Sequence, residues 1–194
     1  TDGTIAVYDN VMGSDFAPSV MRIIVPSDAS GTQISVNSHG IVYDADSDRL
    51  VVSDVGDASI ADDGQIFVLN NASTADGAVE PSRTIAGPST MLGNPVDIIL
   101  SGTTLRVAEK SNDAILVYTN IFSGDSGDIA PTHSTSSVKP ESLAEMTDMP
   151  EMADFSDQAL ADVTIGGVSA SSNPATAGDT TGMVVQFDAS LGSQ

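Results

Sequence analysis

The chain has 194 residues, which is enough to bury a hydrophobic core, and 40% of them are hydrophobic although only 4% are aromatic. Its 27 acidic and 6 basic residues give a formal charge of −21, which disfavours nucleic acids and anionic membranes as partners because like charges repel. It has no cysteine, which excludes disulfide bonds and thiolate chemistry, and no apolar run approaches the roughly 18 residues of a membrane span.

One short run of β-branched and other apolar residues recurs along the chain. It occupies residues 5–10, 66–71 and 115–120, with a looser copy at 183–188. Each of the first three copies is followed by a polar loop and then a proline, and the first two steps between copies measure 61 and 49 residues. Such a repeat indicates a small unit of strands that recurs with loops of variable length.

Two further strands are expected between consecutive copies of this run. Residues 40–44 correspond to residues 95–100, and residues 50–54 correspond to residues 105–109. The first pair are short apolar runs, which is typical of a strand that is covered on both faces. Residues 83–87 fit the fourth, outer strand of one unit.

The expected strands carry four sequence motifs. In chain order these are Leu50-x-Val52-Ser53-Asp54, Ile66-x-Val68-Leu69-x-Asn71, Pro81-Ser82-Arg83-Thr84-Ile85-x-Gly87 and Pro95-x-x-Ile98. They resemble the NHL-type repeats and the related repeats of six-bladed β-propellers, and the resemblance covers roughly residues 1–135. It implies four-stranded blades that stack around an axis. It leaves function open, because members of this group include binding scaffolds, lactonases and lyases.

We therefore predict an all-β fold, a β-propeller of about three to four four-stranded blades that forms a partial or small ring. The expected single domain spans residues 1–194. Its blades are expected at about residues 1–38, 40–88 and 95–135, and residues 136–194 are interpreted as a degenerate blade or an insertion.

The expected strands do not close a ring in the usual way. The chain begins with the third and fourth strands of a blade, so the first two strands of that blade are missing, while the copy at 183–188 adds another third strand. Either residues are absent, or another chain supplies the missing strands, or the ring is a compact four-bladed one with irregular ends. The chain also starts at Thr1 without an initiator methionine or a leader, as a processed or excised polypeptide would.

The segment near residues 134–182 departs from the repeat and is expected to be irregular. Residues 134–137 are serine and threonine, which is typical of a linker. Residues 140–146 begin with a proline and suit the start of a short helix.

The many acidic residues have two interpretations. A solvated carboxylate coat suits a protein that lives in high salt, where self-repulsion is screened, and most of the aspartates fall in expected turns. Alternatively, two clusters hold calcium. The candidate metal ligands are Asp44, Asp46 and Asp48 in one hairpin turn, and Asp54, Asp57, Asp62 and Asp63 in a loop between two strands. The Asp-x-Asp-x-Asp spacing can direct three carboxylates at one ion, although Arg49 and Val55 replace the glycine and the final acid of an EF-hand loop.

No set of catalytic residues is recognised in the sequence. His39 and His133 are the only histidines, too few for a three-histidine zinc site, and no Gly-x-Ser-x-Gly, phosphate-loop or His-Glu-x-x-His motif occurs. Glu109 and Lys110 end one strand and Asp54 ends the corresponding one, so they are expected at one rim, where an unspecific binding site is one interpretation.

These observations favour a non-enzymatic protein that is secreted, periplasmic or attached to the cell surface. Its expected partner is another protein or copies of itself. The alternative is a calcium-dependent propeller hydrolase or lactonase, with carboxylates and an asparagine around calcium in the central channel.

Overall fold

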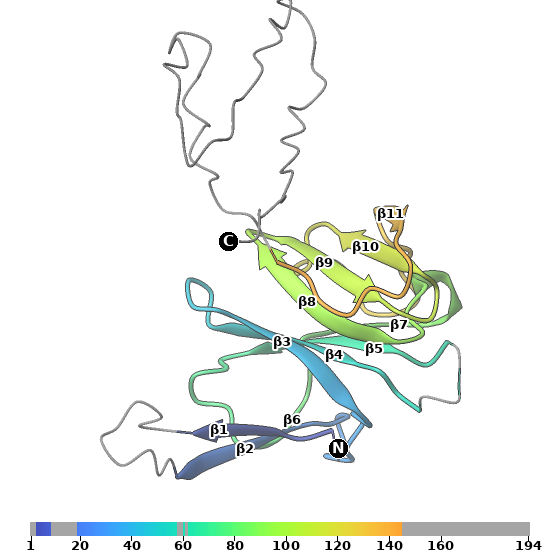
Figure 1. The fold of residues 1–194 in the computed structure, drawn as a ribbon. Coiled ribbons are helices and arrows are strands. Elements are labelled where there is room, and N and C mark those ends of the chain that lie inside the picture. Colours follow the sequence, from blue (N-terminus) through green and yellow to red (C-terminus); the bar gives the residue numbers. More distant parts are fainter. Residues whose placement is uncertain (1–2, 9–18, 58–59, 61, 145–194) are drawn as a thin grey trace, which may run out of the picture. The chain divides into compact units, whose positions relative to one another are not determined.

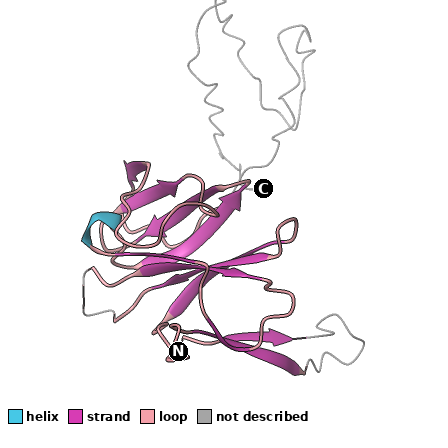
Figure 2. Ribbon diagram, turned by 180° about the vertical axis from the view of Figure 1, so that it is seen from behind, coloured by secondary structure: helices cyan, strands magenta, loops and turns pink. Residues whose placement is uncertain are grey.

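A computed structural model describes residues 3–8, 19–57, 60 and 62–144 (Figure 1). These residues belong to the first of two compact units, Thr1–Met146, and the second unit, Thr147–Gln194, lies outside the described residues. Their regular structure consists of β-strands and one short 3₁₀ helix, η1 (Pro88–Thr90) (Figure 2). The predicted all-β class is therefore confirmed.

Eleven strands are found in the described part of the chain. They are β1 (Ile5–Tyr8), β2 (Val20–Pro26), β3 (Ser38–Asp44), β4 (Arg49–Asp54), β5 (Gln65–Asn70), β6 (Gly77–Val79), β7 (Arg83–Ala86), β8 (Pro95–Ser101), β9 (Thr104–Glu109), β10 (Ala114–Tyr118) and β11 (His133–Ser136). They form three sheets: the first sheet has the order β1-β2-β6, the second has β3-β4-β5-β7 and the third has β8-β9-β10-β11.

The second and third sheets are built in the same way. In each, four strands pair antiparallel in the order in which the chain makes them, apart from the short β6 that joins the first sheet. The first sheet differs, because β1 and β2 pair antiparallel while β6 runs parallel to β2, with Gly77 opposite Ile24.

The strands predicted from the repeat are found where they were expected. The recurring run forms β1, β5 and β10, the strands expected before it form β3, β4, β8 and β9, and the expected outer strand is β7. The looser copy at 183–188 and most of the expected degenerate blade at 136–194 lie outside the described residues. The described residues contain no closed ring, so the propeller itself stays a prediction.

Two predictions for the irregular segment were wrong. Residues 134–137 were expected to be a linker, but His133–Ser136 is the strand β11, whose backbone pairs with β10 although its four side chains are all exposed. Backbone pairing at a sheet edge needs no apolar side chain, so the sequence pattern gave no signal. Residues 140–144 form no helix, because the Leu143 amide donates to Asp97 Oδ2 at 2.7 Å and Glu141 pairs with Lys110 instead.

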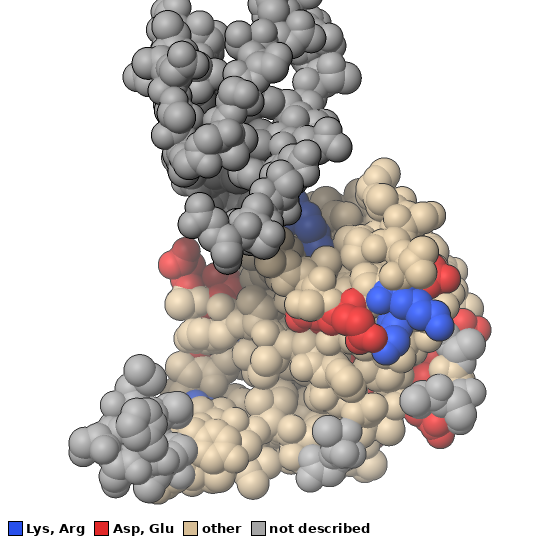
Figure 3. Space-filling model, viewed as in Figure 1, with Lys and Arg blue, Asp and Glu red and all other residues tan. Residues whose placement is uncertain are grey.

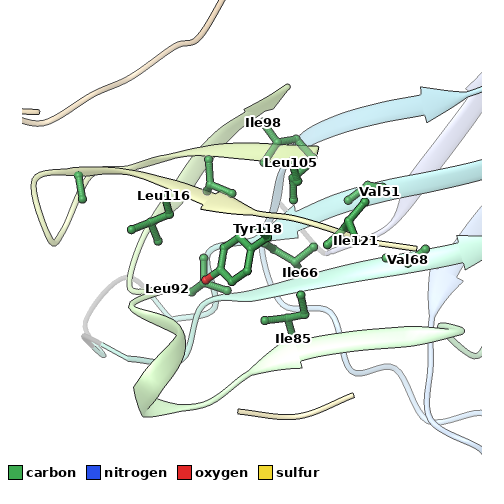
Figure 4. Close-up of a cluster of buried hydrophobic side chains, with 12 residues drawn as sticks. Val51, Ile66, Val68, Ile85, Leu92, Ile98, Leu105, Leu116, Tyr118 and Ile121 are labelled. Atoms are coloured by element: carbon green, nitrogen blue, oxygen red, sulfur yellow. The ribbon is translucent and has the colours of Figure 1, made fainter. Parts of the chain in front are cut away.

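The three sheets lie as layers, with the second sheet between the first and the third (Figure 1). Alternate residues of β4 face opposite layers, because Val51 packs against the third sheet while Leu50 and Val52 pack against the first. The larger cluster lies between the second and third sheets (Figure 4). Its buried members are Val51, Ile66, Val68, Ile85, Leu92, Ile98, Leu105, Val107, Ala114, Leu116, Tyr118 and Ile121.

Close contact between the second and third sheets depends on a glycine in β3. A Cβ atom added to Gly40 would lie 2.9 Å from Ser53 Oγ and 3.0 Å from Ile98 Cγ1, so any larger residue would push β8 away. The Ser53 hydroxyl accepts from the Gly40 amide at 2.9 Å and donates to the Pro95 carbonyl at 2.8 Å, which ties β3, β4 and β8 together.

An arginine in the last antiparallel strand of one sheet donates hydrogen bonds to a loop of the following sheet. Arg83 in β7 is buried, and its guanidinium donates to the carbonyls of Asn120, Ile121 and Asp125 in the loop after β10. Arg22 in β2 does the same one sheet earlier, donating to the carbonyls of Ala72 and Ala75 in the loop after β5. The sheets therefore repeat in their contacts with one another as well as in their strands.

Candidate functional site

The first acidic cluster lies in the hairpin turn between β3 and β4, and its carboxylates already have partners within the protein. Asp48 accepts hydrogen bonds from the Ser73 amide and hydroxyl, both at 2.8 Å, and from the Tyr43 hydroxyl at 3.0 Å. Asp44 accepts from the Ser47 hydroxyl, while Asp46 is exposed. The turn is thus fastened to the loop after β5, which is a structural use of the Asp-x-Asp-x-Asp run.

These hydrogen bonds also shift two ionisation equilibria. The Ser73 backbone amide, followed by the Ser73 hydroxyl, lowers the pKa of Asp48 below the usual carboxyl value of 3.8, because both bonds favour the charged form. The bond to Asp48 raises the pKa of Tyr43, because the phenol donates its proton to a carboxylate. The arrangement stabilises the turn with Asp48 ionised and Tyr43 neutral.

The second acidic cluster is divided between a buried and an exposed part. Asp54 is fully buried at the end of β4, where it accepts from the backbone amides of Val36, Asn37 and Gly56. Asp63 accepts from the Asp57 amide at 2.8 Å, and Asp62 is exposed. Backbone donors therefore occupy both carboxylate oxygens of Asp54, whereas Asp63 accepts only at Oδ2 and its buried Oδ1 has no hydrogen-bond partner among the described residues.

The other acid expected at the same rim, Glu109, is also buried and bonded to backbone amides. Its carboxylate accepts from Gly93, Asn94 and Asn112. Like Asp54, it ties down the residues that lead into the first strand of its own sheet. Both acids are inaccessible to a ligand at that rim, which favours the structural role over the binding role.

The described residues contain no group of three or more histidine, cysteine, aspartate or glutamate side chains placed to hold a metal ion. Asp44, Asp46 and Asp48 do not converge on a common point where they could bind one ion. In the second cluster, Asp54 is buried in the protein while Asp57 and Asp62 are exposed to solvent. His39 in β3 and His133 in β11 are both exposed. Calcium binding stays a hypothesis that a calorimetric titration can test.

A different feature marks the first sheet, in which one edge of β1 has no partner among the described strands. Among the described strands, β1 pairs with β2 alone, whereas β5 and β10, which share its sequence motif, pair on both sides. A strand with a free edge carries backbone donors and acceptors that a further strand can use.

The face of β3 that is directed toward the first sheet is uncovered. Ile41 lies opposite Val52 in β4, and Ile98 lies opposite Val107 in β9, so the two isoleucines hold equivalent positions in successive sheets. Ile98 is 4% exposed because the second sheet covers it, but Ile41 is 51% exposed. Tyr43, which follows it on the same face, is 49% exposed. The first sheet therefore reaches β4 but stops short of β3.

The outer face of the first sheet is uncovered as well. Tyr8 in β1 is 48% exposed, whereas Leu69 and Tyr118, its counterparts in β5 and β10, are fully buried. Met21 and Ile23 in β2 are exposed beside it. On the face seen in Figure 3, acidic side chains lie over the second and third sheets, while the region of β1 and β2 is mostly neutral. Apolar surface of this kind in a strongly acidic protein is typical of an interaction site.

The exposure of Ile41 and Tyr43 was not expected from the sequence, because the apolar run at 40–44 was interpreted as covered on both faces. In the structure only the face with Gly40 and Val42 is covered, by the third sheet. The number of strands expected from the repeat could have indicated this exposure. That number gave the first blade only its third and fourth strands, so no strand was expected to cover this face of β3. None of the described residues forms a helix long and apolar enough to cross a membrane. No protein-family model matches the chain, and no curated protein matches it.

Proposed function

We propose that the chain is a non-enzymatic β-propeller module of the extracellular space, which binds a protein partner or assembles with copies of itself. The observation that supports binding is the pair of open surfaces on the first sheet and on β3. Ile41 and Tyr8 are about half exposed where the equivalent residues of the following sheets are buried, and Tyr43 is about half exposed where its equivalent, Leu100, is partly buried. Leaving these side chains in water is unfavourable, and burying them against a partner recovers the hydrophobic free energy.

The stacking of the sheets supports the propeller part of the proposal. Successive sheets pack face to face and repeat both the buried acid, Asp54 or Glu109, and the arginine, Arg22 or Arg83. A stack in which each unit buries its faces against its neighbours is the principle of a propeller ring. The NHL-type resemblance of the motifs points to the same arrangement.

The charge of the protein supports a place outside the cytoplasm in salty surroundings. With a formal charge of −21, the folded chain repels itself at low ionic strength, and dissolved salt screens that repulsion. We propose that the protein is secreted, periplasmic or attached to the cell surface, and a high surrounding ionic strength would suit its charge.

Native mass spectrometry of the full chain, isolated gently from its source, tests the binding function. We expect a discrete mass well above the 19.8 kDa of the single chain. A single-chain mass at all concentrations, together with slow hydrogen exchange throughout β1, would show that no partner is needed. That result would overturn the proposed function.

A further inference from the structure

The repeat indicates which strand would lie beside β1, whose second edge is unpaired among the described strands. Its Ile5 is the counterpart of Ile66 in β5 and Ile115 in β10, and each of those strands has an antiparallel neighbour, β4 or β9, on the side where β1 has none among the described strands. A strand in that position would continue the first sheet in the direction of β3. The open position is therefore shaped for an antiparallel β-strand of about the length of β4.

The uncovered face of β3 lies next to this position. Val52 packs in the same cluster as Ile5, so the first sheet covers β4. Ile41 pairs with Val52 across the β3–β4 ladder, one strand further out. A strand added to β1 at the usual spacing of about 4.8 Å would extend over this neighbouring strand. It would then shield Ile41 and Tyr43, as the second sheet shields Ile98.

Charge selects the kind of occupant. A second copy of the chain would bring a further −21 to a protein that already carries −21, and at low ionic strength, where salt does not screen it, this repulsion opposes the encounter. An extended segment with lysine or arginine beside its apolar residues is attracted by the same field. The strands β1 and β2 carry no acidic side chain, so the contact between β1 and an added strand can be apolar.

We propose that a basic, extended segment of a partner protein adds a strand antiparallel to β1 and covers Ile41 and Tyr43. This inference rests on the proposed binding function. The strand β4 is a guide to its sequence, because β4 pairs with the counterpart of β1: Val51 lies opposite Val68, and Ser53 lies opposite Ile66. The segment is therefore expected to have small or β-branched side chains at alternate positions on the side directed toward β3.

A synthetic peptide tests the proposal directly. The probe has the sequence of β4, Arg49–Asp54, preceded by two lysines and a fluorescent label, and its binding to the full chain is followed by fluorescence anisotropy. We expect saturable binding, and slower hydrogen exchange of the Ile5–Tyr8 amides when the peptide is bound. The same peptide with N-methyl groups on the amides of one edge keeps its side chains but loses donors, and should bind at least about tenfold more weakly.

Variants of the protein locate the peptide. Ile41→Asp should weaken binding about tenfold or more, because it places a charge under the added strand. Val138→Asp makes the same kind of change at an exposed site, 87% accessible, and should leave binding unchanged. Both positions are exposed, so both variants are expected to fold, and denaturation midpoints verify this.

The other outcomes overturn this inference in distinguishable ways. Slow exchange of the β1 amides in the peptide-free monomer would show that the edge is already paired. A concentration-dependent dimer that Ile41→Asp disrupts would make a second copy the occupant. A native complex with a partner that forms equally well with Ile41→Asp would refute strand addition here but leave the proposed binding function standing.

Discussion

Asp54 and Glu109 occupy the same position in two successive sheets, and each uses its carboxylate to hold the backbone that enters the sheet. Asp54 accepts from the Asn37 amide and Glu109 accepts from the Asn94 amide, one residue before β3 and β8 respectively. The residue after each acid returns a backbone bond, from Val55 to the Asn37 carbonyl and from Lys110 to the Asn94 carbonyl. The repeat thus includes a buried charge whose compensation comes from backbone amides.

Replacing this carboxylate by an amide should destabilise the fold. In Asp54→Asn, one carboxylate oxygen becomes an NH2 group that cannot accept a hydrogen bond, so either the Val36 amide, which bonds to Oδ2, or the Gly56 amide, which bonds to Oδ1, loses its partner. We expect the free energy of unfolding to fall by at least about 2 kcal/mol. Denaturant unfolding measures the change. Asp46→Asn, at an exposed site of the neighbouring turn, is the control and should stay within about 0.5 kcal/mol of the parent.

Arg83 offers a test of how the second sheet is joined to the third. Replacing it by Met fills similar space but leaves the carbonyls of Asn120, Ile121 and Asp125 without their buried donor. We expect Arg83→Met to lower the free energy of unfolding by about 3 kcal/mol, and Arg83→Lys to lower it less, because the ammonium still donates. Equal stability of the parent and both variants in denaturant unfolding would contradict a stabilising role for the hydrogen bonds from Arg83 to the loop after β10.

The strands were predictable where apolar runs repeat, because burial between layers imposes β-branched and aliphatic residues on both faces. Ile66 and Val68 face one neighbouring sheet and Leu69 faces the other, and their shared motif was visible in the sequence. The strand β11 was missed because its four exposed polar residues take part only through their backbone. Pairing with an existing edge leaves no trace in side-chain pattern.

The open surface could be predicted only in outline. Counting strands indicated that two were missing at the start of the chain, but the exposure of Ile41 depends on how far the first sheet extends over the second. Ile41 and Ile98 occupy similar sequence patterns and differ twelvefold or so in exposure because of their neighbours in other layers. The same limit applies to Asp54, because two of its bonding partners, Asn37 and Val36, lie 17 and 18 residues away in the chain.

Acid should loosen the turn between β3 and β4. The pKa of Asp48 is lowered in the folded protein, so ionised Asp48 stabilises the fold at pH values above the usual carboxyl pKa of 3.8. That contribution is lost as the pH falls through the lowered pKa and the carboxylate is protonated. Carboxyl chemical shifts measured by NMR should show Asp48 titrating below 3.8, and Asp48→Asn should flatten this part of the stability curve. Titration of Asp48 at or above 3.8 would contradict the bonds from Ser73.

Salt and calcium separate the two interpretations of the acidic surface. Screening of the −21 charge should raise the melting temperature as potassium chloride is added, without saturation at a stoichiometric concentration. At matched ionic strength we expect calcium to give no further rise, because Asp48, Asp54 and Asp63 already accept hydrogen bonds from the protein. Differential scanning calorimetry with calcium chloride against potassium chloride measures this. A saturable extra rise that disappears in Asp46→Asn or Asp62→Asn would instead establish a calcium site in the corresponding cluster, since a ligand that binds the folded state stabilises it by mass action.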